Sequence, residues 1–598
     1  MPDSVWSPEV DALVRGTVES PPFPSPPDWR DHWIYFLMVD RFDRPDAPPA
    51  FQPWNGEHGV FQGGNFAGIT RRLDYLKELG VGAIWLSPVI KNCQYSPFTY
   101  HGYGFQDFLR IEPRFASDPA AAANDTDIAD REFRELVDAA HARGLYVILD
   151  IVLNHAGDVF EYEGHGPEAP WRDTEYAIRW RDATGAGRPD WADAPATPEP
   201  DAAVWPMEMR SNTLFRRKGR GGELGGDFAS LKELVTERQD PQGRFPARGA
   251  LIRAYQYLVA RFDVDGFRID TLKYIERDFA RVFGNAMREF ALSIGKKNFF
   301  TFGEVYDNEE TISHFVGRFA TDPSELVGVD AALDFPLFYR LANVAKGISA
   351  PSEVIDVFEH RKQVQRSVVS SHGDASRFFV TFLDNHDQRH RTHYVEPENP
   401  TRYDDQLTLA LGCLFALQGI PCLYYGTEQG LHGAGGSDAS VREALWGRPN
   451  AFDENHPFFR AVRELSRVRQ DTPALRYGRQ YFRPISGNGT DFGISTFPNG
   501  ILAFSRILNE TEVVVAANTS TMDERSVEVL VDASLNPAGS RLDVRFSNQS
   551  APVSPGAVLH KPHGQVFIRE AGGGTSAGPA NTLRLTLRPM ELQVLARA

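Results

Sequence analysis

Several acids stand at the ends of short apolar segments of this sequence. Asp150 lies within ILDIVLNH, Asp270 ends GFRID, Glu304 lies in FGEVY, and Asp384 and Asp387 lie in FLDNHD. Any one of them could be a capping or salt-bridging acid. If the apolar segments are parallel strands of one barrel, however, their carboxyl ends meet at one face and the acids converge there. Glycoside cleavage is catalysed by a pair of carboxyl groups: one ionised carboxylate beside the anomeric carbon and one protonated acid near the leaving oxygen.

The residues next to two of these acids suggest which one is the ionised carboxylate and which one is the general acid. Arg268 precedes Asp270 by two residues and therefore points to the same side of the strand, where it can hold that carboxylate ionised. Glu304 follows the aromatic run FFTFG, whose apolar surroundings we expect to raise the pKa of Glu304 and suit it to general acid catalysis. A retaining enzyme holds such a pair about 5–5.5 Å apart, a distance that neighbouring barrel strands can span.

The elements that must position these acids alternate between strand and helix. Helical patterns occur near 66–79, 130–143 and 248–262. The apolar strand candidates between the helices are 34–40, 81–88, 145–155, 264–270, 299–306, 329–336, 378–387 and 420–428. This alternation is typical of parallel βαβ units, and eight strands are the number that closes a TIM barrel.

The alternation is interrupted once and then ends. Residues 156–226 are rich in Gly, Pro, Asp and Trp, and a stretch of this length inside a compact domain indicates an inserted functional segment. After about residue 475, short alternating segments separated by Gly, Asn and Pro predict an antiparallel β-sandwich, which we interpret as stabilising. The first thirty residues end in the Pro-rich PPFPSPPDW and predict an N-terminal arm.

Composition excludes several classes of partner. The chain has 598 residues and a formal net charge of −17, which argues against nucleic acid or an anionic membrane as the main partner. Its three cysteines are too few for a disulfide framework. The start, MPDSVWSPEV, has no basic region followed by an apolar one, and no apolar run reaches the length of a membrane span, so we expect a cytoplasmic protein.

The acid-bearing segments resemble the signature regions of the α-amylase superfamily (glycoside hydrolase family 13). They match in order as DIVLNH (150–155), GFRIDTLK (266–273), FGEVY (302–306) and FLDNHD (382–387). The resemblance covers roughly residues 33–450. It implies an α/β fold with a (β/α)8 TIM barrel over 33–154 and 228–470, a B domain inserted after strand 3 over 155–227, and a C-terminal antiparallel β-sandwich over 475–598, behind the arm at 1–32.

The resemblance also implies roles for individual residues. Asp270 matches the nucleophile, Glu304 the acid/base, and Asp387 the third acid, which stabilises the transition state. The residues implied to bind substrate are Tyr103, His155, Arg268, Lys273 and His386, with the Tyr103 ring offered for stacking on sugar. Asp150 is interpreted as structural, and Asp384 inherits no role.

A structural calcium ion is implied as well. In calcium-dependent members an Asn of the first signature region and an Asp late in the insertion help to hold the ion, and Asn154 and Asp227 match those positions. Both side chains offer the oxygen ligands that Ca²⁺ prefers. No organic cofactor is expected.

Departures from the common pattern leave the substrate open. Tyr274 follows Lys273 where many starch enzymes have His, Gly104 follows Tyr103 where many have Trp, and GGDFASL replaces the commoner PDLN form. We expect a retaining α-glycosidase acting on α-1,4-glucans or maltooligosaccharides, with an α-glucan transglycosidase as the alternative and an α-1,6 or disaccharide specificity still open. A non-catalytic sugar-binding homologue is the rival of another class, although it would usually lack one of the three acids. The insertion's tryptophans, Trp171, Trp191 and Trp205, fit either glucan contacts or the core of that segment.

Overall fold

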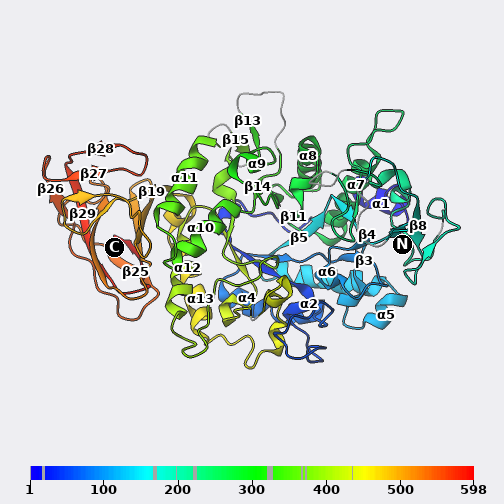
Figure 1. The fold of residues 1–598 in the computed structure, drawn as a ribbon, viewed down its shortest axis with the longest axis horizontal. Coiled ribbons are helices and arrows are strands. Elements are labelled where there is room, and N and C mark those ends of the chain that lie inside the picture. Colours follow the sequence, from blue (N-terminus) through cyan, green and yellow to red (C-terminus); the bar gives the residue numbers. More distant parts are fainter. Residues whose placement is uncertain are drawn as a thin grey trace.

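The computed structural model describes residues 2–16, 21–165, 172–196, 198–219, 225–319, 328–364, 368–370, 373–433 and 435–597. Within them a parallel eight-stranded sheet runs in the order β14-β12-β11-β5-β2-β1-β18-β17 (Figure 1). The sheet closes on itself, because Leu333 pairs with Val380 in a parallel bridge and the Asp334 amide donates to the Val380 carbonyl at 2.9 Å. The predicted barrel fold is therefore confirmed. Its strands are β1 (Ile34–Leu37), β2 (Ala83–Leu86), β5 (Tyr146–Val152), β11 (Gly266–Asp270), β12 (Phe300–Gly303), β14 (Ala331–Ala332), β17 (Val380–Phe382) and β18 (Ile420–Tyr424).

The barrel interior is filled by large side chains that follow from the apolar strand sequences. Phe36 of β1 stacks on Trp85 of β2 with ring centroids 3.8 Å apart, and Trp85 meets the edge of Phe302 of β12 at 5.5 Å. Helices cover the outside (Figure 1). They include α3 (Phe66–Arg71), α4 (Leu73–Leu79), α6 (Asp127–His141), α7 (Pro246–Phe262), α8 (Arg277–Ser293), α10 (Phe335–Ala345), α11 (Ser352–Val364), α12 (Asp404–Ala416) and α13 (Pro457–Asp471). The interior is thus a packed core, and polar chemistry is confined to the strand ends.

The segment after β5 leaves the barrel and forms small sheets of its own. The strands β7 (Phe160–Tyr162), β8 (Ile178–Arg181) and β9 (Gly187–Arg188) form one sheet, and β6 (His155–Ala156) pairs with β10 (Lys232–Glu233) in another. Trp205 is buried and Trp191 packs against the core. Of the two alternatives for these tryptophans, glucan contacts or the core of the insertion, these positions fit the core. Trp171 lies outside the described residues. β10 therefore returns the chain to the end of β5, beside the expected site.

The C-terminal strands form two facing sheets. One contains β19 (Arg479–Phe482), β22 (Ile501–Leu508), β23 (Thr511–Asn518), β30 (Leu592–Ala596) and β25 (Asp543–Ser547); the other contains β20 (Ile485–Ser486), β24 (Arg525–Val531), β29 (Ala580–Leu587) and β26 (Leu559–Lys561). Val514 of the first sheet packs in one buried cluster with Val529 and Leu583 of the second, which confirms the predicted antiparallel sandwich. The sandwich and the insertion lie at opposite ends of the long axis (Figure 1).

The N-terminal segment contains a helix that the Pro-rich pattern did not predict. α1 (Pro8–Arg15) begins after Ser7, whose side chain accepts from the Val10 amide, and Arg253 of α7 forms an ion pair with Asp11. Further on, Trp29 is fully buried and stacks on Phe300 of β12 at 5.1 Å. These contacts fasten the arm to α7 and to the amino-terminal end of β12.

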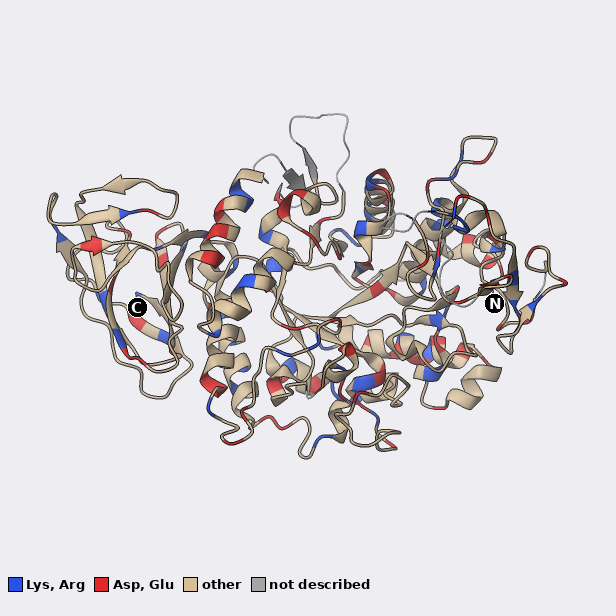
Figure 2. Ribbon diagram, viewed as in Figure 1, with Lys and Arg blue, Asp and Glu red and all other residues tan. Residues whose placement is uncertain are grey.

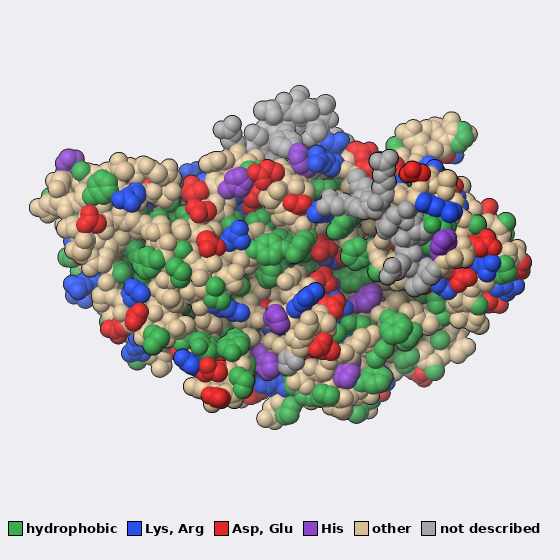
Figure 3. All heavy atoms as spheres, in the orientation of Figure 1, with side chains coloured by type: hydrophobic (Ala, Val, Ile, Leu, Met, Phe, Trp, Pro, Cys, Tyr) green, Lys and Arg blue, Asp and Glu red, His purple; other side chains and the backbone are tan. Residues whose placement is uncertain are grey.

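The surface matches the composition. Lys and Arg alternate with Asp and Glu along the ribbon (Figure 2), and the face drawn in Figure 3 carries no continuous basic area. In the part of the chain that the structure describes, no helix is long and apolar enough to span a bilayer.

Candidate active site

One guanidinium holds three carboxylates at the carboxyl ends of the barrel strands. Arg268 Nη1 lies 2.7 Å from Asp270 Oδ1 and 2.8 Å from Asp150 Oδ1, and Arg268 Nη2 lies 2.8 Å from Glu304 Oε2. The strand register explains the meeting, because Arg268 of β11 lies beside Asp150 of β5 on one side and Phe302 of β12 on the other. Asp270 and Glu304 are therefore bridged by a single cation, an arrangement compatible with the roughly 5–5.5 Å separation of a retaining pair.

The charges in this cluster do not balance. Burial raises the pKa of Asp270 well above its usual value, the charges of Glu304, Asp150 and Asp387 raise it further, and only Arg268 opposes them. Burial also raises the pKa of Asp150 to about 6, against the attraction of Arg268. Asp270 and Asp150 therefore retain their protons at pH values where isolated acids would have lost them.

The backbone after β11 is strained in a way that serves Glu304. Thr271 has a φ of 48°, a left-handed conformation that a β-branched residue avoids and that costs about 1–3 kcal/mol. This turn lets the Thr271 amide donate to Glu304 Oε2 at 3.1 Å. The expectation of apolar surroundings for Glu304 was wrong, because Arg268 reaches across from the neighbouring strand and makes them polar.

Asp387 is positioned by an arginine that the sequence patterns did not single out. Arg442 Nη2 lies 3.2 Å from Asp387 Oδ1, and Arg442 Nε donates to the His386 carbonyl at 2.9 Å. Arg442 also donates to the Tyr100 hydroxyl at 2.8 Å. Arg442 lies in an irregular stretch after β18 with no recognisable motif. The sequence therefore gives no signal for its role beyond the fact that it is an arginine. The Asp387 side chain remains 44% exposed, toward the cavity.

All three acids line one cavity of about 830 Å³. Tyr103 and His155 line it too, and the Tyr103 hydroxyl donates to Asp150 Oδ2 at 2.8 Å and lies 2.9 Å from His386 Nε2. The His155 side chain is buried, and among the described residues neither of its ring nitrogens has a hydrogen-bond partner. Burial lowers the pKa of His155 to about 4, which keeps its ring neutral.

The rim of the cavity carries the departures noted in the sequence. Lys273 Nζ pairs with Asp307 at 3.0 Å, so its charge is compensated. Tyr274 and Phe228 line the cavity with ring centroids 6.2 Å apart, and Phe228 is 53% exposed. A Cβ at Gly104 would meet Thr99 Cγ2 at 2.7 Å, so a larger residue there would require Thr99 to shift. The structure therefore gathers the predicted catalytic and substrate-binding residues around one cavity; Arg268 and His386 contact its lining residues.

Comparison with known families now decides the classification. The model of the alpha amylase catalytic domain matches residues 36–455, most of the chain. The chain belongs to this family. The predicted resemblance is confirmed, and the match ends just before α13 (Pro457–Asp471), ahead of the C-terminal strands.

Relatives of the family include hydrolases and a transferase. The chain is 28% identical to an alpha-amylase of Streptomyces lividans over 518 residues, which are 78% of this chain and 52% of that protein. It is 25% identical to a cyclomaltodextrin glucanotransferase of Klebsiella oxytoca over 549 residues, covering 84% and 73% of the two chains. Among solved structures, the acarbose complex of the Geobacillus thermoleovorans alpha-amylase shares the fold with a TM-score of 0.62 at 23% identity, over 96% of this chain and 99% of that one. The chain spans about half the length of the Streptomyces relative.

The predicted calcium ligands are not arranged as a cation site. Asp227 Oδ2 accepts from the Tyr162 hydroxyl at 2.8 Å and from Lys232 Nζ at 3.1 Å, and Asp227 Oδ1 accepts from the Glu233 amide at 3.2 Å. Asn154 is buried and its backbone carbonyl accepts from the Leu234 amide at 2.8 Å. No group of three or more His, Cys, Asp or Glu among the described residues is placed to hold a metal ion. Asp227 is already bound to a cationic side chain and does not fit the implied role.

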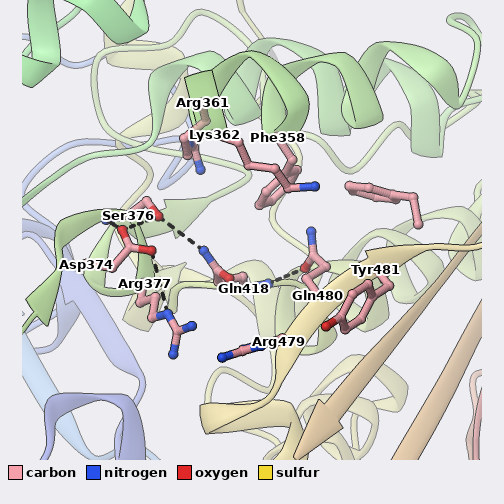
Figure 4. Close-up of a pocket in the computed structure, with 11 residues that line it drawn as sticks. Phe358, Arg361, Lys362, Asp374, Ser376, Arg377, Gln418, Arg479, Gln480 and Tyr481 are labelled. Carbon is pink, nitrogen blue, oxygen red and sulfur yellow. Dashed lines mark hydrogen bonds and ion pairs between the residues drawn. The ribbon is translucent and has the colours of Figure 1, made fainter. Parts of the chain in front are cut away.

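A second cavity, of about 320 Å³, lies between α11 and β19 (Figure 4). Its lining contains several basic side chains but one carboxylate, Asp374, which accepts from the Ser376 hydroxyl at 2.8 Å. Arg361 at its edge pairs with Asp334 and Glu309. A lone carboxylate cannot supply both an acid and a nucleophile, so we assign the glycosidic chemistry to the larger cavity.

Proposed function

We propose that this protein is a retaining enzyme of α-glucosidic bonds, acting on α-1,4-glucans or maltooligosaccharides. The observation that carries the proposal is the Arg268 guanidinium, which bridges Asp270 and Glu304 inside a cavity that also exposes Asp387. Apolar residues at these strand ends would serve the structure of the barrel equally well, so stability alone does not explain Arg268 and the three acids. This disfavours a non-catalytic homologue. A release assay with starch, maltooligosaccharides, sucrose and trehalose separates the two ideas: a catalyst releases reducing sugar from at least one of them.

The chemistry assigned to the three acids follows from their positions. Asp270 attacks the anomeric carbon as Glu304 protonates the leaving glycosidic oxygen, so the C–O bond breaks and a covalent glycosyl ester forms. Glu304, now ionised, takes the proton of an incoming hydroxyl, which attacks the ester and frees Asp270. Asp387 faces the same space and can accept hydrogen bonds from sugar hydroxyls as positive charge develops in the transition state.

Substrate contacts are assigned on the same basis. His155 and Tyr103 line the cavity together with the three acids, and we assign both to the binding of the reacting sugar. Phe98, Phe228 and Tyr306 line the rim and are 65%, 53% and 52% exposed. These exposed aromatic faces suit the C–H faces of successive glucosyl units, which favours a chain substrate over a single sugar.

Whether water or a second sugar attacks the intermediate decides between hydrolysis and transfer. The open cavity favours hydrolysis, and we expect maltoheptaose to give shorter products with one new reducing end for each bond broken. A time course that follows product lengths and reducing ends together measures this. Products longer than the substrate at a constant number of reducing ends would instead assign the protein to transglycosylation, the alternative we retain.

The unbalanced charges predict a pH dependence. Asp270 must be ionised to attack the anomeric carbon, and its pKa is raised by burial and further by Asp150, so activity should rise as the pH rises through this raised pKa. Asp150→Asn removes one carboxylate and frees Arg268, and both effects lower the pKa of Asp270. The acidic limb of the pH profile of kcat/KM for maltoheptaose should therefore move to lower pH, by on the order of one pH unit.

The matched control for this prediction is Asp384→Asn. Asp384 is also buried, but it accepts from the Thr392 amide and does not contact the cluster around Arg268 among the described contacts. The Asp384→Asn variant should keep the wild-type position of the acidic limb. A limb that stays in place in the Asp150 variant, or moves to higher pH, would contradict the charge argument.

A further inference from the structure

Lys232 is a buried lysine at the junction of the insertion and the barrel. Its side chain is 1% exposed, and its Nζ lies 3.1 Å from Asp227 Oδ2 and 3.4 Å from Asp158 Oδ1. The same ammonium lies over the rings of Tyr162 and Phe160, 4.8 Å and 5.1 Å from their centroids. Two carboxylates and two aromatic faces compensate the cost of burying the charge.

The partners of Lys232 come from different parts of the fold. Lys232 and Glu233 form β10, which pairs with His155 and Ala156 of β6 directly after the third barrel strand. Asp158 follows β6, and Tyr162 belongs to β7 in the insertion. The ammonium therefore joins the start of the insertion, its first sheet and its closing segment at one point.

We propose that Lys232 is the built-in cation of this junction, so that it takes over at Asp227 the role that the sequence resemblance implied for calcium. Both oxygens of Asp227 are engaged by the donors of Tyr162, Lys232 and Glu233. A divalent ion on this carboxylate would have to lie against the Lys232 ammonium, and the repulsion between the two positive charges opposes its binding.

The junction also forms part of the wall of the catalytic cavity. His155 and Asp158 line that cavity; Lys232 pairs with Ala156, the neighbour of His155, and forms an ion pair with Asp158. Loss of the ammonium should therefore loosen both the insertion and the wall that contacts substrate. The effect on substrate binding rests on the proposed function, whereas the effect on stability does not.

The test compares thermal unfolding of the full chain with chelator and with added calcium chloride. We expect the same wild-type midpoint in both conditions, whereas Lys232→Met should lower the midpoint by about 5 °C or more, since a buried carboxylate pair then lacks its cation. A wild-type midpoint that falls with chelator and recovers with calcium would overturn the proposal, and so would a Lys232→Met midpoint equal to that of the wild type.

Two further variants separate the charge from general damage. The double variant Lys232→Met with Asp227→Asn should regain part of the lost midpoint, because no unpaired charge is left at Asp227; a double variant no more stable than Lys232→Met would contradict the ion pair's role.

Lys296 is the matched control, because it is equally buried and pairs with Asp263 and Asp265 at 2.7 Å, away from the cavity lining. Lys296→Met should lower the midpoint without raising KM for maltoheptaose, whereas Lys232→Met should do both. Equal KM values in the two variants would refute the coupling to the cavity wall.

Discussion

Asp270→Asn should abolish turnover of maltooligosaccharides, with a loss of at least about 10⁴-fold in kcat. The amide of Asn cannot form the glycosyl ester, so the covalent route is closed. The fold should survive, because Asp270 is crowded by the charges of Glu304, Asp150 and Asp387, and a neutral side chain relieves that repulsion. We therefore expect a thermal midpoint equal to or above that of the wild type.

Initial rates and thermal unfolding of the same preparation check this prediction. Asp384→Asn is again the control, since it removes a buried acid from the end of β17 outside the cluster around Arg268. Substantial residual activity of the Asp270 variant, with contamination by wild-type enzyme excluded, would show that another residue is the nucleophile.

Glu304→Gln should divide substrates by their leaving groups. A natural glycoside needs a proton on its leaving oxygen, and loss of the acid should reduce kcat by about 10²–10⁴-fold. A glycosyl fluoride leaves with little help from an acid, so glycosylation of Asp270 should be far less impaired. Hydrogen bonding can persist in this variant, because the Gln carbonyl can still accept from the Thr271 amide that now contacts Glu304 Oε2.

Fluoride release and maltoheptaose cleavage by the Glu304→Gln variant provide the two rates. We expect the rate of maltoheptaose cleavage to fall much more than the rate of fluoride release. Equal losses on both substrates would mean that Glu304 does not act as the acid or that the substitution disturbs the whole site.

The barrel and the positions of its acids could be predicted because both depend on local sequence. Each strand is a short apolar run. Closure of eight such runs into a barrel brings Asp270 and Glu304 to its carboxyl-terminal face, independently of the loop conformations. Arg268 was predictable for the same reason, since a residue two positions before Asp270 shares its side of the strand.

The remaining features depend on contacts between distant parts of the chain. Arg442 positions Asp387 from an irregular segment, and Lys232 reaches both Asp227 and Asp158, pairings that no local pattern encodes. The same limit produced the wrong expectation for Glu304, because its aromatic strand gave no sign of the guanidinium reaching across from β11. Local patterns specify the strand ends, while long-range packing specifies what surrounds them.

If Asp270 forms the glycosyl ester, the ester can be trapped and located. The Glu304→Gln variant is incubated with an α-maltosyl fluoride and quenched in acid, and the added sugar is located by peptide mass spectrometry. We expect one maltosyl unit on the peptide that contains Asp270, and none when Asp270 is also replaced by Asn. Fluoride release without any sugar on that peptide, or with sugar on another acid, would contradict the assignment of Asp270 as the nucleophile.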